Sequence, residues 1–205
     1  MDVLSAMSQN LHHLTTLSLS MRLDSSEEGV MGDEYDAQFA LIKRIEVMTA
    51  KLVSLNNLQL DFDTFIFCCE IMSYRDRFRK FLDCSRQALE PLCQLRRLCL
   101  GFRKVYEDRR YSAEILQERL LQRFHVTEYA QTFPALEYLC VKEEVFDEEL
   151  RRYEAVPEGV LCQIVRQEDG IVGFQEYAPN SSAFFAFQKT FESSWVEAPP
   201  KQCWN

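Results

Sequence analysis

Histidine and cysteine are the side chains best suited to binding a metal ion or acting as a nucleophile, and the 205 residues of this chain include three histidines and eight cysteines. None of His12, His13 and His125 stands at a spacing from Cys, Asp or Glu that is typical of a metal site. The sequence also lacks a GxSxG motif, a Walker-type loop and a dinucleotide-binding glycine loop. We therefore predict no catalytic, cofactor-binding or metal-binding residues and a protein that is not an enzyme.

Carboxylates gather after position 142, where they could do general acid-base chemistry. A solvated loop explains them more simply, because runs of like charge are usually exposed. The residues are Glu143, Glu144, Asp147, Glu148 and Glu149. One alternative stays open, a small hydrolase or transferase on an α/β fold whose residues meet only in three dimensions. A buried Cys or Ser beside a His with a strongly shifted pKa would support that alternative.

The elements that must position any site are indicated by four copies of the pattern LxxLxxLxL, which start at intervals of 40 or 41 residues. The copies begin at Leu11, Leu52, Leu92 and Phe133, and fourteen of their sixteen apolar positions are Leu. The spacing changes within each copy from three residues to two, which indicates a helical turn that leads into a short strand. A repeat of this size is typical of a solenoid, whose units bury their apolar faces by stacking.

The residues between the copies predict helices. Phe39, Ile42, Ile45 and Met48, for example, follow one another at steps of three. We therefore expect an α/β fold, a short leucine-rich-repeat solenoid of about four irregular repeats of roughly 40 residues. Parallel strands would line one face and helices the other. We assign residues 1–150 to this array.

The pattern changes beyond the fourth copy. Asp169 and Gly170 separate two β-rich segments and predict a hairpin, so we assign 151–178 to a terminal strand and hairpin. We expect residues 179–205 to form an aromatic C-terminal helix and tail, because apolar residues recur at steps of three and four: Phe184, Phe187, Phe191 and Trp195. We favour a lid that covers the last repeat over a membrane-surface helix or a motif that docks in a partner's groove.

Residues that alternate with the inward leucines point to the open face of the predicted sheet. If the units stack in register, equivalent residues form rows such as Thr16, Asn57, Arg97 and Tyr138, which contains an Arg and a Tyr, types favoured at binding hot spots. We predict that this open face binds a protein. The predicted binding residues are Thr16, Ser18, Ser20, Asn57, Gln59, Asp61, Arg97, Cys99, Tyr138, Cys140 and Lys142.

Cys99 and Cys140 occupy the same position in neighbouring copies, so their Cα atoms could come within disulfide range. We expect two reduced thiols, because disulfides are rare inside cells. The formal charge of −9 argues against binding nucleic acid or an anionic membrane. The sequence has neither a secretion signal nor a long apolar run, so we expect a cytoplasmic or nuclear protein.

The leucine-rich copies, with the segment 133–141 and the following hairpin over 162–170, resemble the C-terminal half of fungal F-box-like leucine-rich proteins. The resemblance covers residues 4 to 145. It implies that the chain is the substrate-binding region of an F-box-type ubiquitin ligase receptor. The alternative is a stand-alone leucine-rich scaffold or adaptor.

In that family an N-terminal F-box binds a Skp-type adaptor. We recognise no F-box here, so adaptor binding is implied only for a chain with an upstream F-box. The helical pattern begins at Leu4 with no cap before it. We therefore expect that residues preceding Met1 in a longer relative have been lost.

Overall fold

The computed structural model describes most of the chain's repeated segments and its C-terminal helix. The described residues are 13–21, 42–65, 74–104, 125–147, 152–167, 172–178 and 181–192. Within them the protein is α/β, with one six-stranded sheet and four helices. The predicted α/β class is therefore confirmed.

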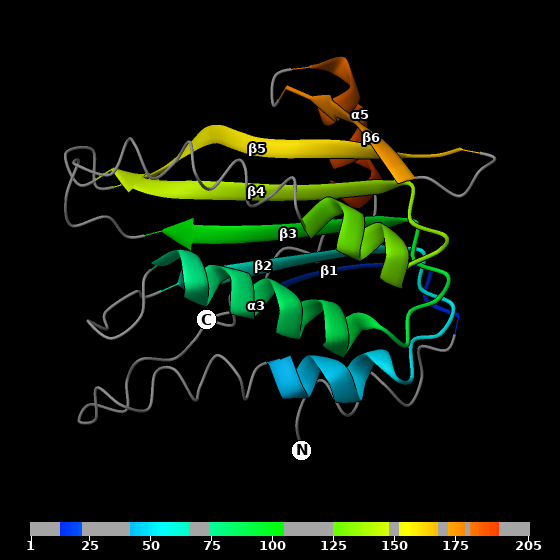
Figure 1. Cartoon of the computed structure of the whole chain (residues 1–205). Helices are drawn as coiled ribbons and strands as arrows, with labels where there is room; N and C mark the ends of the chain where they lie inside the picture. Colours follow the sequence, from blue (N-terminus) through cyan, green and yellow to red (C-terminus); the bar gives the residue numbers. More distant parts are fainter. Residues whose placement is uncertain are drawn as a thin grey trace, which may run out of the picture.

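The six strands lie in the sheet in the order of the sequence (Figure 1). They are β1 Thr16–Met21, β2 Asn57–Phe65, β3 Arg97–Lys104, β4 Tyr138–Asp147, β5 Arg152–Arg166 and β6 Val172–Tyr177. Strands β1 to β4 pair in parallel, whereas β5 is antiparallel to both of its neighbours. Parallel pairing needs a long crossover between strands, and the intervals of about 40 residues supply it.

The leucines of the repeated pattern set the register of the four parallel strands. Leu17 pairs with Leu58, which in turn pairs with Leu98, and Leu98 pairs with Leu139. A slip by one residue would turn these leucines to the opposite face, so burial of one face fixes the register. The four strands and their in-register pairing are as the sequence predicts.

Three helices cover the face of the sheet that carries these leucines (Figure 1). They are the helix over 42–49, α3 Tyr74–Leu89 and the helix over 125–132. The first turns Ile42, Ile45 and Met48 into the core, as its apolar spacing predicts. Leu58 and Leu98 are fully buried beneath these helices. Burial of this continuous aliphatic layer is the main source of stability of the described fold.

A short turn leads from each of these helices into the next strand. It contains the LxxL part of the pattern, in which the amide of the second apolar residue donates a hydrogen bond to the carbonyl of the first. The three pairs are Leu55 to Leu52, Leu95 to Leu92 and Leu136 to Phe133, each at 3.0 Å. Identical local hydrogen bonding therefore starts β2, β3 and β4 in the same way.

The last of these turns has an extra partner from β5. Arg166 donates from Nη1 to the carbonyl of Leu136 at 2.9 Å, and from Nη2 to those of Ala130 at 3.0 Å and Phe133 at 2.9 Å. A guanidinium on these carbonyls complements the negative end of the helix over 125–132. Strand β5 thus fastens the end of that helix.

Helix α5, Ser182–Glu192, lies on the other face of the sheet (Figure 1). The hydroxyl oxygen of Ser181 accepts a hydrogen bond from the amide of Phe184 at 3.2 Å, which caps the helix. Its aromatic stripe packs on residues of β3 to β6, and its backbone also lies close to β1 and β2. The helix covers residues of the fourth copy, Tyr138 and Cys140, and extends across neighbouring strands as a third layer.

Several predictions concern residues outside the described segments. They include the helical start from Leu4, the turn at Asp169 and Gly170, Trp195, and the boundaries of 1–150 and 179–205 at their outer ends. The antiparallel pairing of β5 with β6 is present on either side of that turn. Among the described residues, no helix is long and apolar enough to cross a membrane.

Candidate functional site

The polar face of the sheet presents three rows of side chains across the parallel strands. The first row is Thr16, Asn57, Arg97 and Tyr138; the second is Ser18, Gln59, Cys99 and Cys140; the third is Ser20, Asp61, Gly101 and Lys142. Each row joins residues that pair directly between neighbouring strands. The structure therefore brings together all eleven residues that the sequence predicts for binding, but their environments differ from row to row.

The first row is a continuous polar strip. Asn57 donates from Nδ2 to the hydroxyl of Thr16 at 2.9 Å, and Arg97 donates from Nη1 to Oδ1 of Asn57 at 3.2 Å. The guanidinium carbon of Arg97 lies 5.8 Å from the ring centroid of Tyr138, within the range of a cation–π interaction. All four side chains are partly exposed. The row is therefore held in place and still accessible at its surface.

The strip continues beyond the parallel strands. Gln163 of β5 pairs with Tyr138, and its Oε1 accepts a hydrogen bond from the hydroxyl of Tyr177 at 2.7 Å. Gln163 lies at the level of the first row, whereas Tyr177 pairs with Leu161, at the level of the second row. Sequence reasoning missed Gln163 and Tyr177, because their place depends on the antiparallel register of β5 and β6.

The third row contains an ion pair that spans two strand spacings. Nζ of Lys142 lies 3.1 Å from Oδ1 of Asp61, with Gly101 on the strand between them. A Cβ atom at Gly101 would overlap Asp61 and approach Cε of Lys142 to 2.9 Å. Gln59 donates a hydrogen bond to the other oxygen of Asp61. The missing side chain of Gly101 is what allows the two charges to meet.

The ion pair also affects the ionisation of Lys142. Burial opposes the charge of its ammonium group, but the electrostatic influence of Cys99 and Asp61 outweighs burial and raises the pKa of Lys142. Lys142 is thus positively charged near neutral pH. Because Lys142 is paired with Asp61, the charges of the third row largely cancel, and the row presents little net charge to a partner.

The second row is not open as predicted, because α5 lies over its β3 and β4 end. Cys99 is 3% exposed and Cys140 is fully buried, and both pack against the aromatic stripe of α5. Small thiols provide an apolar surface that aromatic rings can cover. The predicted exposure of Cys99 and Cys140 is therefore wrong: both thiols lie beneath α5. Ser18 and Gln59, at the β1 and β2 end of the row, remain partly exposed.

The cysteines of the described residues are all free thiols, as expected. A hydrogen bond with Cys99, together with burial, raises the pKa of Cys140 well above that of an ordinary thiol. The neutral thiol is a poor nucleophile. Cys140 consequently serves packing between the sheet and α5.

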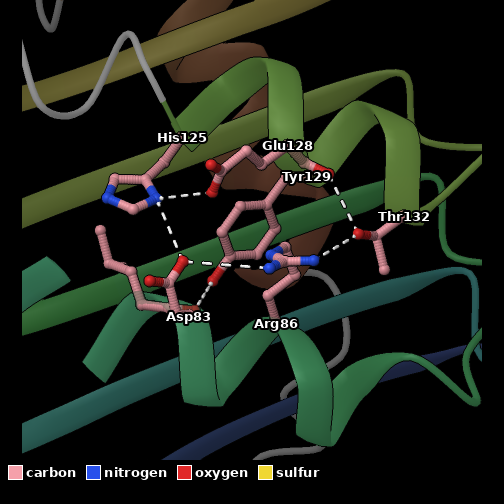
Figure 2. Close-up of polar contacts among 7 residues, drawn as sticks. Asp83, Arg86, His125, Glu128, Tyr129 and Thr132 are labelled. Atoms are coloured by element: carbon pink, nitrogen blue, oxygen red, sulfur yellow. Dashed lines mark hydrogen bonds and ion pairs between the residues drawn. The ribbon is translucent and has the colours of Figure 1, made fainter. Parts of the chain in front are cut away.

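A second cluster of titratable groups lies in the helical layer on the opposite face. It consists of Asp83 from α3 and of His125 and Glu128 from the helix over 125–132 (Figure 2). Nδ1 of His125 lies 3.3 Å from Oε2 of Glu128 and 3.8 Å from Oδ1 of Asp83. His125 is 2% exposed, whereas both carboxylates are partly exposed. One ligand atom from each residue lies within 4.8 Å of the other two.

Neighbouring side chains tie the two helices together around this cluster (Figure 2). Arg86 donates from Nη1 to the hydroxyl of Thr132 at 3.0 Å, and its Nη2 lies 3.9 Å from Oδ1 of Asp83. The buried hydroxyl of Tyr129 donates to the carbonyl of Leu82 at 2.9 Å. The groups of the cluster are therefore held by contacts on either side of them.

Burial lowers the pKa of His125, although Asp83 and Glu128 act in the opposite sense. The imidazole is thus neutral at neutral pH and retains a lone pair on one ring nitrogen. Burial also raises the pKa of Tyr129, which stays a neutral hydrogen-bond donor. The cluster combines one neutral nitrogen ligand with two carboxylates.

Sequence reasoning missed this cluster, since one of its members is remote in the chain. His125 and Glu128 stand three residues apart, so the same helical face presents both. Asp83 precedes His125 by about forty residues and reaches it only because α3 packs beside the next helix. The i, i+3 pair was the one signal that the sequence offered.

Comparison with known proteins does not identify a family. No protein-family model matches the sequence, and no curated protein is significantly similar to it. Among solved structures, the central domain of yeast acetyl-CoA carboxylase is a weak match, with 8% sequence identity and a TM-score of 0.30. The match covers 58% of this chain, which spans only 20% of that protein chain.

Proposed function

We propose that this protein is a non-catalytic recognition module, and that its first row, Thr16, Asn57, Arg97 and Tyr138, contributes the central contacts to a protein partner. The observation that carries the proposal is the continuous linkage of this row. Four strands each supply one polar side chain, and hydrogen bonds and a cation–π contact connect them while leaving them partly exposed.

Such a row suits binding because its side chains are ordered before a partner arrives. Fixing a flexible side chain on association costs about 0.5 to 1.5 kcal/mol, and a side chain that is already held avoids most of that cost. Arg97 and Tyr138 are also of the residue types that dominate binding energy at interfaces. A partner that offers a carboxylate or backbone carbonyls to Arg97 fits this chemistry.

Within the described residues, the guanidinium of Arg97 donates one hydrogen bond, to Asn57, although it carries five N–H donors. The remaining donors are available to acceptors on a partner. The aromatic ring of Tyr138 lies beside them and contacts Phe187 of α5, with ring centroids 6.2 Å apart. Arg97 and Tyr138 therefore form the natural anchor of the proposed interface.

The wider proposal is a short array of leucine-rich units. It is supported by strands that follow sequence order, by leucines paired in register and by three like turns. A narrower proposal, the substrate-binding region of an F-box-type ubiquitin ligase receptor, depends on the sequence resemblance alone. The stand-alone scaffold is its alternative.

The recognition proposal can be tested by site-specific crosslinking in cells. A photoreactive phenylalanine analogue at position 138 should crosslink to a defined partner, because that position lies within the proposed interface. Arg97→Ala in the same chain should reduce the crosslinked product at least tenfold, since one charge-assisted hydrogen bond is worth about 1.5 to 3 kcal/mol.

Arg44, exposed on the helix over 42–49, provides the matched control. Arg44→Ala should leave the crosslink unchanged, and neither substitution should lower the free energy of unfolding by more than about 1 kcal/mol. Crosslinking that is insensitive to Arg97→Ala would contradict the proposal. So would partners that are captured only by a photoreactive residue placed on the helical layer.

The ligase proposal needs a separate measurement. A Skp-type adaptor should co-purify with a version of the chain that carries an upstream F-box, while the 205-residue chain should still bind its partner without the adaptor. Failure of the longer version to bind the adaptor would remove the ligase connection and leave the scaffold reading.

A further inference from the structure

The cluster in the helical layer contains the kinds of atoms that bind transition metals. Nδ1 of His125 and one oxygen each of Asp83 and Glu128 lie within 4.8 Å of one another (Figure 2). We propose that Asp83, His125 and Glu128 form a site for one divalent transition-metal ion of the zinc class, which links α3 to the helix over 125–132. The site lies on the face of the sheet opposite the first row and does not depend on the recognition proposal.

The separations fit a metal site of this kind. Zinc binds imidazole nitrogen and carboxylate oxygen at roughly 2.0 to 2.2 Å, so two ligands of a tetrahedral ion lie about 3.4 Å apart. The observed separations from Nδ1 of His125 are 3.3 Å to Glu128 and 3.8 Å to Asp83. Small side-chain adjustments would bring all three atoms to one ion.

The two carboxylates also favour a cation. Arg86 lies 3.9 Å from Asp83 but directs its closest hydrogen bond to Thr132, and the charge of Arg79 also acts on His125. Oε2 of Glu128 is buried beside Nδ1 of His125, 3.3 Å away. A cation between these two atoms would bind both of them in place of the contact that joins them.

The donor set selects the class of metal. Imidazole nitrogen favours zinc, cobalt and nickel, whereas magnesium and calcium prefer oxygen ligands throughout. Three protein ligands leave a tetrahedral ion with one further position, which water can occupy. Glu128 and His125 come from one helix and Asp83 from another, so the ion would act as a crosslink between them.

The test is a titration of the reduced 205-residue chain with Zn²⁺ and with Co²⁺. Calorimetry should show one Zn²⁺ per chain, and Co²⁺ should give visible absorption bands of a nitrogen and oxygen site. Asp83→Asn and Glu128→Gln keep the shape of each side chain and should each weaken binding at least tenfold, because ligand loss exceeds the usual effect of a supporting residue. Zn²⁺ should raise the Tm of the unmodified chain and have little effect on the two variants.

Glu46→Gln is the matched control, since Glu46 is an exposed helical carboxylate that pairs with Lys43 at 2.8 Å. Its binding should equal that of the unmodified chain. Circular dichroism would establish that each variant is folded; His125→Ala is less suitable, because it also removes a buried ring. The proposal is overturned by any of three results. These are no saturable 1:1 binding of Zn²⁺, binding by Asp83→Asn and Glu128→Gln that is as tight as in the unmodified chain, or a cobalt spectrum dominated by thiolate charge transfer.

Discussion

The two faces of the sheet are built in different ways. On one face, leucines repeat at the same position of each parallel strand and three helices pack over them. On the other, the residues between those leucines differ from strand to strand, and α5 covers only part of them. The first face is specified by repetition, whereas the second depends on individual contacts. Stability should therefore reside mainly in the first, and recognition in the second.

The largest expected effect follows from Leu98→Ala on the helix-covered face. Leu98 is fully buried in the middle of the sheet, so truncation leaves a cavity that its close-packed neighbours cannot fill. We expect the free energy of unfolding to fall by about 3 to 5 kcal/mol, measured by urea denaturation.

Val53→Ala is the control for this substitution, because Val53 is 51% exposed on the turn that leads to β2. Its effect should stay within about 0.5 kcal/mol. If both variants lowered the free energy of unfolding equally, the helix-covered face would not be the main source of stability.

A smaller effect should follow from Phe187→Ala on the α5 face. Phe187 contacts the ring of Tyr138 and belongs to the same buried cluster as Cys140. The helix can undock locally instead of unfolding the whole sheet. We expect a loss of about 2 to 3 kcal/mol, near or below the lower end for buried phenylalanines. Because α5 shields the thiol of Cys140, its alkylation should be much faster in Phe187→Ala than in the unmodified chain. Mass spectrometry would follow the reaction.

Phe185 offers a control from the same helix, since it is 54% exposed. Phe185→Ala should change neither stability nor the alkylation of Cys140. If Cys140 were alkylated no faster in Phe187→Ala than in the unmodified chain, α5 would not be what shields this thiol.

The smallest effect is expected from Gly101→Ala. The new methyl group would displace Asp61 and Lys142 and so break their ion pair, but both groups lie at the ends of flexible side chains. We expect a loss of about 1 kcal/mol, the low end for overpacking. Gly173→Ala is the matched control, because its nearest new contact is the carbonyl oxygen of Val165 at an ordinary 3.8 Å.

A double-mutant cycle sharpens this measurement. In an Asp61→Ala background, the ion pair is already absent and the space beside Gly101 is open, so Gly101→Ala should cost less than it does alone. An unchanged cost would mean that the backbone of β3, and not the ion pair, sets the requirement for glycine.

The helix-covered face could be predicted from the sequence because its cause is local and repeated. The change of spacing from three to two placed the strands, and leucine burial fixed their register, as the pairing of Leu58 with Leu98 shows. The row Thr16, Asn57, Arg97 and Tyr138 then follows from the alternation of side chains along a strand.

The other face could not be predicted in the same way. The aromatic stripe of α5 shows that one side of the helix is buried, but nothing in it identifies the surface that it covers. Cys99 and Cys140 alternate with leucines, a pattern that predicts an exposed face, although thiols pack as readily as small apolar groups. Asp83 and His125 meet through the packing of two helices, a contact that spacing within one helix does not encode.

The reversal of chain direction between β4 and β5 has a consequence for how such a protein can change in length. A duplicated unit inserted among β1 to β4 would find a parallel neighbour on each side and could reuse the same turn, as β2 and β3 already do. Beyond β4 the partner strand runs the opposite way and Arg166 holds the preceding turn. Growth by gene duplication is therefore open within the parallel part of the sheet and closed at its antiparallel border.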